Sequence, residues 1–261
     1  MFTNAQIFKI ARMQSAIDSS CNPDDFLAFS NKTVLSRPNI QARKYLDLPF
    51  SCDLTSYGNN IVASVAKELA TDIERYINSY AIEHCFETPA IQVLNELLKK
   101  HGCCVCFMAE YFLPDVTQIA PLPCRYETRL LYPKDFDTLY LPQWSNALCK
   151  QRRQLDVLGV GAFDGDRLIG LAGCSADCDT MWQIGIDVLP EYRRQGIAAS
   201  LTSRLAWEAL KKDIVPFYCC AWSNLKSKKN ALKSGFKPAW VQLTARSISF
   251  TEEISRPSSF F

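Results

Sequence analysis

The sequence of 261 residues has little histidine, little net charge and no long apolar run. It contains two histidines, His84 and His101, and its 29 basic residues nearly balance its 27 acidic residues, for a formal charge of +2. A near-neutral chain gives no reason to expect nucleic acid or an anionic membrane as a partner. No stretch approaches the roughly 18–20 apolar residues that a membrane-spanning helix needs. With 48% hydrophobic residues, the composition is that of a globular protein.

The N-terminus also lacks the continuous apolar core of a secretory signal, because Lys9, Arg12 and Asp18 interrupt it. Twelve cysteines therefore need an explanation other than a secreted disulfide scaffold. Three residues separate Cys174 from Cys178, and no second pair repeats that spacing, so we expect no metal site. We interpret the cysteines as small core hydrophobes in a reducing, cytoplasmic environment.

The chain divides at a proline-containing segment. Pro114, Pro121 and Pro123 fall within ten residues and indicate a linker over 116–123. Before it, residues 1–115 form a helix-rich region: apolar residues recur at helical spacing over 61–73, reaching 77, and again over 90–100. Gly102 is placed to end the second helix, and 103–112 follow as a strand. We make no assignment for the first 50 residues.

After the linker, residues 124–261 alternate between strand and helix patterns. We expect a strand over 124–132, two short helical pieces over 133–148 and an antiparallel meander over 157–163, 167–175 and 181–188. The turn Asp164-Gly165-Asp166 joins the first two strands of the meander. A helix at 196–212, a strand at 215–221, a helix at 224–233 and a strand around 240–248 complete the region.

The most informative stretch is residues 184–210, a strand, a polar loop and an amphipathic helix. Pro190 stops the strand and Gly196 opens the helix. The first N–H groups of a helix have no partner within it, and the helix dipole makes that end positive. A glycine lets a ligand approach the backbone closely. The loop at 193–198 therefore predicts an anion site suited to a pyrophosphate, although an ordinary strand-loop-helix with solvated arginines has the same spacing.

This stretch resembles the signature of the GNAT superfamily of acyl-CoA-dependent N-acetyltransferases. The signature is Arg or Gln, two residues, Gly, one residue, then Gly or Ala, and it is matched by Arg193, Gly196 and Ala198. Residues 224–236 look like the second motif, with Asn224 and Ser227 in place. The resemblance covers about half of the chain and implies an α/β (α+β) fold, a GNAT-like mixed, mostly antiparallel twisted sheet flanked by helices. It says nothing of residues 1–115.

The resemblance also implies a coenzyme A site. The pyrophosphate would lie on the signature loop, and the pantetheine arm would pair with the strand before it, at a slot opened where strand 215–221 splays away. The implied contacts are Ile186, Val188, Leu189, Arg193, Arg194, Gln195, Gly196, Ile197, Ala198, Asn224 and Ser227. Lys226, Lys228, Lys229 and Lys233 are either further phosphate contacts or a solvated helix face.

The resemblance implies that a neutral amine attacks the acetyl thioester directly. A base then takes the proton of the amine, and an acid helps the thiolate to leave. Many members carry a Tyr acid seven residues after the motif Asn, but that position is Ala231. We therefore name Tyr218 as candidate acid, with Tyr192 as a second phenol. Asp187 is the candidate base, ahead of Glu127, although strand alternation places it opposite Val188 unless a bulge intervenes.

The leading hypothesis is an N-acetyltransferase that uses acetyl-CoA and an unidentified amine acceptor. The alternatives are a non-catalytic acyl-CoA-binding regulatory module and a transferase auxiliary to an interaction domain in residues 1–115. Cys219 and Cys220 have no nearby His to activate them, so we interpret them as buried thiols. Trp182, Trp222 and Trp240 either line an acceptor pocket or pack in the core. The sequence leaves open whether the chain forms homo-oligomers.

Overall fold

The computed structural model describes residues 2–256, which divide into two compact units. Unit 1 comprises residues 2–11 and 111–239, and unit 2 comprises residues 12–110 and 240–256. Three elements run from one unit into the other: α1 (Asn4–Ser19), β4 (Cys103–Pro114) and β10 (Phe236–Ser247). The units thus differ from the predicted ranges, because the chain crosses between them within continuous helices and strands rather than at a linker.

Unit 1 contains a mixed, mostly antiparallel sheet in the order β9-β8-β7-β6-β5, with the end of β4 beside β9. Its strands are β5 (Glu127–Leu131), β6 (Asp156–Asp164), β7 (Arg167–Ser175), β8 (Met181–Val188) and β9 (Val215–Ala221). β5 to β8 pair antiparallel in sequence order, and β8 pairs parallel with β9. The predicted fold class and the predicted meander with its turn at Gly165 are confirmed.

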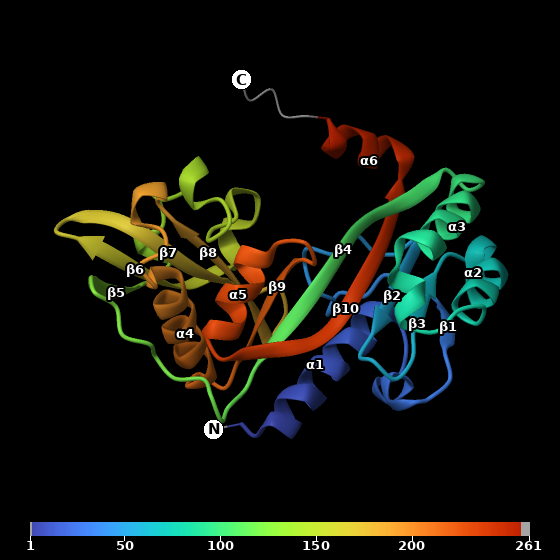
Figure 1. The fold of residues 1–261 in the computed structure, drawn as a ribbon, viewed down its shortest axis with the longest axis horizontal. Coiled ribbons are helices and arrows are strands. Elements are labelled where there is room, and N and C mark those ends of the chain that lie inside the picture. The colour runs from blue at the N-terminus through green and yellow to red at the C-terminus, as the bar shows by residue number, and fades with distance from the viewer. Residues whose placement is uncertain (1, 257–261) are drawn as a thin grey trace. The chain divides into compact units, whose positions relative to one another are not determined.

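Two helices of unit 1, α4 (Ile197–Leu210) and α5 (Leu225–Lys233), lie side by side (Figure 1) and are joined by the Asn230 amide, which donates to the Thr202 hydroxyl at 3.0 Å. A Cβ on Gly170 would contact Ile197 and Leu201, so α4 packs on the face of β7 that bears Gly170. On the opposite face Phe136, Trp144 and Leu148 form a small core. They come from residues 133–148, where the two predicted short helical pieces are 3₁₀ helices at Pro133–Asp135 and Pro142–Trp144.

Unit 2 contains strands in the order β1-β3-β2-β10, followed by β4. They are β1 (Lys32–Leu35), β2 (Cys52–Ser56) and β3 (Val62–Val65), with the parts of β4 and β10 named above. α2 (Ala70–Ile77) and α3 (Thr88–Lys99) cover one face, where Leu54, Ile73 and Leu94 are fully buried. α6 (Ile248–Ser255) follows β10.

One prediction for this region is wrong. Residues 62–65 belong to β3 and the helix begins only at Ala70. The run Ile61-Val62-Ala63-Ser64-Val65 is buried on both sides of a sheet, and a continuous apolar run in a strand mimics the stripe of a buried helix. The helix predicted at 90–100 and the strand at 103–112 are confirmed, and Gly102 ends α3 with a φ of +70°.

The other face of the unit 2 sheet carries buried polar side chains beside Val62, which packs with Phe26 and Ala16. Asp53 is fully buried and accepts hydrogen bonds from Gln242, Thr244 and Thr55 at 2.6–3.0 Å. Burial raises the pKa of Asp53 to about 6. Nearby, Asp18 of α1 and Arg43 form a buried ion pair at 2.6 Å. Within residues 2–256, no helix is both long and apolar enough to cross a lipid bilayer.

Candidate functional site

The predicted anion loop lies between β8 and α4 in unit 1. Pro190–Tyr192 form one 3₁₀ turn, and α4 starts at Ile197. Arg194 and Gly196 adopt left-handed conformations, with φ of +63° and +83°. A Cβ on Gly196 would meet nothing within 4 Å, so glycine serves the backbone conformation there and not a steric limit. Residues 193–196 are all exposed.

The first turn of α4 supplies the donors. Ser200 donates its amide to the Gly196 carbonyl at 3.1 Å, which closes the first turn. The amides of Ile197, Ala198 and Ala199 precede that bond and point toward the exposed loop, where the helix dipole is positive. The small side chain of Ala198 leaves them accessible. This combination suits a pyrophosphate.

A gap in strand pairing lies next to this loop. The parallel ladder between β8 and β9 runs from Met181 opposite Val215 to Ile184 opposite Tyr218. β8 then continues to Val188 and β9 to Ala221 with no further pairing between them in the described structure. On its other side β8 stays paired with β7 as far as Val188. Residues 185–188 therefore offer one strand edge, as the predicted pantetheine contacts Ile186 and Val188 require.

The second motif lies at the end of β9. The Asn224 side chain caps α5 by accepting from the Ser227 amide at 3.2 Å. The Ser227 hydroxyl is 2.7 Å from the Tyr218 hydroxyl. Burial raises the pKa of Tyr218, so the phenol is protonated at neutral pH. Ala231, where many relatives carry Tyr, is fully buried one turn further along α5.

Asp187 holds a segment of chain against the sheet. Its carboxylate accepts from the amide nitrogen and side-chain nitrogen of Asn146 at 2.8 and 2.7 Å, and from the Ala147 amide at 3.0 Å. The register of β7 with β8 shows no shift from Gly170 to Ser175, so no bulge alters the alternation at this end of β8. Asp187 thus shares a face with Gly185, opposite the face of Val188 against which α4 packs.

The remaining candidates are scattered. Glu127 is exposed and paired with Arg129 at 2.6 Å, which lowers the pKa of its carboxyl. His84 and His101 belong to unit 2. Trp222 is 59% exposed after β9, whereas Trp240 belongs to unit 2 and stacks on Tyr57. Of the α5 lysines, Lys226, Lys229 and Lys233 are exposed and Lys228 is half-buried.

Sequence reasoning missed the neighbours of the signature loop. Tyr126 and Asp164 bind loop side chains, and Asn146 binds Asp187. Their separations from these partners, between 28 and 69 residues, leave no local pattern. Within residues 2–256, no three His, Cys, Asp or Glu side chains gather as a metal ion would require.

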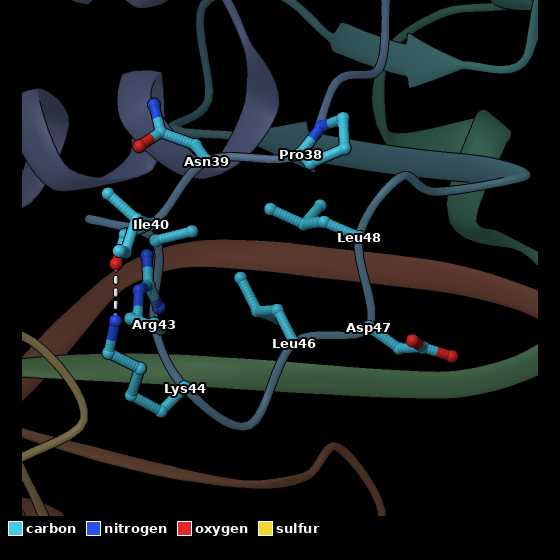
Figure 2. Close-up of a pocket in the computed structure, with 9 residues that line it drawn as sticks. Pro38, Asn39, Ile40, Arg43, Lys44, Leu46, Asp47 and Leu48 are labelled. Atoms are coloured by element: carbon cyan, nitrogen blue, oxygen red, sulfur yellow. Dashed lines mark hydrogen bonds between the residues drawn. The ribbon is translucent and has the colours of Figure 1, made fainter.

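A hollow of about 470 Å³ lies elsewhere, within unit 2 (Figure 2). Its lining comes entirely from residues 38–48 and includes none of the predicted site residues. Arg43 at its edge turns toward Asp18 and Ser15, and the Lys44 amino group donates to the Ile40 carbonyl. Its charged groups are therefore engaged within the protein, and we assign it no ligand.

Comparison with known proteins identifies the family of the chain. The family model described as GNAT acetyltransferase matches residues 74–239, more than half of the chain, including β8, the signature loop, α4, β9 and α5. A search of curated proteins finds no match.

Solved structures with similar folds include acetyltransferases. A GNAT-family acetyltransferase from Novosphingobium aromaticivorans is 17% identical, with a TM-score of 0.42 over 55% of this chain and 66% of its own. A GCN5-related N-acetyltransferase-like protein from Streptococcus suis is 20% identical, with a TM-score of 0.44 over 61% and 69%. A GCN5-related N-acetyltransferase from Sphaerobacter thermophilus is 13% identical, with a TM-score of 0.45 over 72% of each chain. The family assignment rests on the family model, and the chain belongs to the GNAT acetyltransferase family.

Proposed function

We propose that the chain transfers an acetyl group from acetyl-CoA to an amine of an acceptor molecule by direct attack on the thioester. The observation that carries the proposal is the β8 edge over residues 185–188, which is unpaired beyond the Ile184–Tyr218 pair and leads through the signature loop to the amide-lined start of α4. One place thus combines a strand edge for an amide-bearing arm with an anion site for a pyrophosphate.

In this proposal the pyrophosphate lies on the loop residues Arg193, Arg194, Gln195 and Gly196 and on the amides of Ile197 and Ala198. The pantetheine arm runs along Ile186, Val188 and Leu189, with Asn224 and Ser227 on the β9 side. The edge beyond Ile184 supports this placement, because an extended amide chain pairs with a strand edge as a further strand would.

The chemical step needs few groups. The amine nitrogen attacks the thioester carbonyl carbon, the carbon–sulfur bond breaks, and the amine loses a proton as the thiolate gains one. We propose Asp187 as the base and Tyr218, the last β9 residue paired with β8, as the acid. Alignment of the two reactants in the slot supplies much of the rate.

Calorimetric titration with acetyl-CoA tests the binding site. We expect the wild type to bind at micromolar Kd and Gly196→Glu to lose binding, because a carboxylate then occupies the anion site. Gly58→Glu is the matched control, since Gly58 also has a positive φ and open space around it but lies in unit 2. Absence of binding by the folded wild type would overturn the proposal.

The second candidate is a non-catalytic acyl-CoA-binding module, favoured by the buried Ala231 where many relatives have an acid Tyr. The transferase and the binding module differ in whether they turn over acetyl-CoA. The protein is incubated with acetyl-CoA and a panel of small amines and of peptides with free amino termini, and free coenzyme A is measured by chromatography. If any amine accelerates the release of coenzyme A, the transferase is supported. Binding without release for every amine supports the module.

A further inference from the structure

The signature loop is exposed and irregular, yet it holds one defined shape. Residues 193–196 face solvent, and two of the four are in the left-handed region. A loop of this kind has many accessible conformations, and a ligand must supply the ordering unless the protein does so beforehand. One contact is local, because the Arg193 guanidinium donates to the Val188 carbonyl at 3.0 Å. The other contacts described below come from parts of unit 1 that are distant in the sequence.

The first support is Tyr126, which lies just before β5. Its hydroxyl donates to Oε1 of Gln195 at 3.0 Å, in the middle of the loop. Its ring meets the ring of Tyr192 edge-on, with centroids 5.7 Å apart and planes at 79°. Both tyrosines are half-buried, whereas Gln195 is exposed.

The second support is the hairpin between β6 and β7. The Tyr192 hydroxyl donates to Asp164 at 2.9 Å, and the Arg167 guanidinium lies over the Tyr192 ring at 5.6 Å. Arg167 also pairs with Glu191 at 2.6 Å, but both of these side chains are exposed. Exposed ion pairs contribute little, so the tyrosine contacts are the stronger part of this support.

We propose that Tyr126 and Tyr192 are positioning residues that hold the signature loop in its pyrophosphate-binding shape before coenzyme A arrives. Tyr126 acts through Gln195, and Tyr192 acts by tying the start of the loop to the β6–β7 hairpin. This inference rests on the proposed function, because it takes the loop to be the pyrophosphate site.

Titration of the Tyr126→Phe and Tyr192→Phe variants with coenzyme A tests whether these tyrosines position the signature loop. Each variant loses one hydroxyl hydrogen bond and keeps its ring, so we expect the Kd to rise about three- to tenfold. Tyr132→Phe is the matched control and should bind as the wild type does, since its side chain lies outside both supports. S-acetylpantetheine, which lacks the pyrophosphate, should bind the variants and the wild type equally.

A double-mutant cycle with Gln195→Ala isolates the route of action. If Tyr126 acts through Gln195, Tyr126→Phe has no further effect on coenzyme A affinity in the Gln195→Ala background. Additive effects, unchanged affinity in the tyrosine variants, or an equal loss for S-acetylpantetheine would each overturn the inference. A wild type that binds no coenzyme A would instead overturn the proposed function.

Discussion

The carbonyl oxygen of Asn146 lies directly over Gly185, so close that a Cβ at position 185 would be 1.8 Å from it. The carbonyl of Ala147 has the same relation to Gly173, at 2.1 Å. Asp187, two residues after Gly185, accepts three hydrogen bonds from Asn146 and Ala147. The segment is therefore fixed on the sheet beside the end of the β8–β9 ladder, where the proposed site lies.

Gly185→Ala should strongly destabilise the protein. Its Cβ would collide with a backbone oxygen, which cannot rotate away as a side chain can, so we expect the free energy of unfolding to fall by about 3 kcal/mol. Gly170→Ala is the control, because its Cβ would meet only the side chains of Ile197, Leu201 and Val188 at 3.0–3.4 Å. Urea unfolding of both variants measures the difference, and equal losses would contradict this account.

Asp187→Ala should also destabilise, because it removes the acceptor of three hydrogen bonds. Bonds to a charged group count for more than neutral ones, and a loss of about 2–3 kcal/mol in unfolding free energy is expected. Asp187→Asn keeps one acceptor oxygen and should lose less. If Asp187 is also the base, Asp187→Asn should lower kcat by much more than its loss of stability explains. A kcat near that of the wild type would limit Asp187 to a structural role.

Tyr218→Phe tests the proposed acid. Loss of the phenol should lower kcat by about 10²-fold and leave acetyl-CoA affinity nearly unchanged, since the ring still packs against Phe112 and Phe236. Ser227→Ala removes the partner of the hydroxyl but keeps the phenol, and it should lower kcat much less. Steady-state kinetics of the two variants decide between a chemical role and a packing role.

The buried Asp53 predicts a pH-dependent contribution to stability. Its folded pKa of about 6 lies above the ordinary aspartate value of 3.8, so the folded state holds the proton more tightly. The contribution of Asp53 is therefore full below about pH 4 and is lost as the pH rises through about 6.

Asp53→Asn removes this titration. The stability of the wild type relative to the variant should fall by up to about 3 kcal/mol between pH 4 and pH 8. Asp156, whose pKa burial also raises to about 6, is present in both proteins and cancels in the difference. Urea unfolding at several pH values measures it, and a flat difference would contradict the raised pKa.

Local sequence pattern was sufficient to predict much of unit 1. The meander, the turn at Gly165, the helix after Gly196 and the two motifs could be predicted, because each depends on the spacing of apolar residues, on glycine conformation or on a short motif. The same reasoning failed at residues 62–65, where a strand buried on both faces carries no alternation. The catalytic roles of Asp187 and Tyr218 and the coenzyme A contacts stay predictions.

Short-range sequence patterns indicated the resemblance to the family, the signature loop and the order of strands and helices around it, since all of these depend on residues close together in the chain. Three relations could be learned only from the folded chain: the β8–β9 ladder ends at Tyr218, Asp187 binds Asn146, and Tyr126 donates to Gln195. The same holds for the packing of residues 240–256 with 12–110. These relations join residues tens to hundreds of positions apart, and they form only when the packing of whole elements brings those residues together.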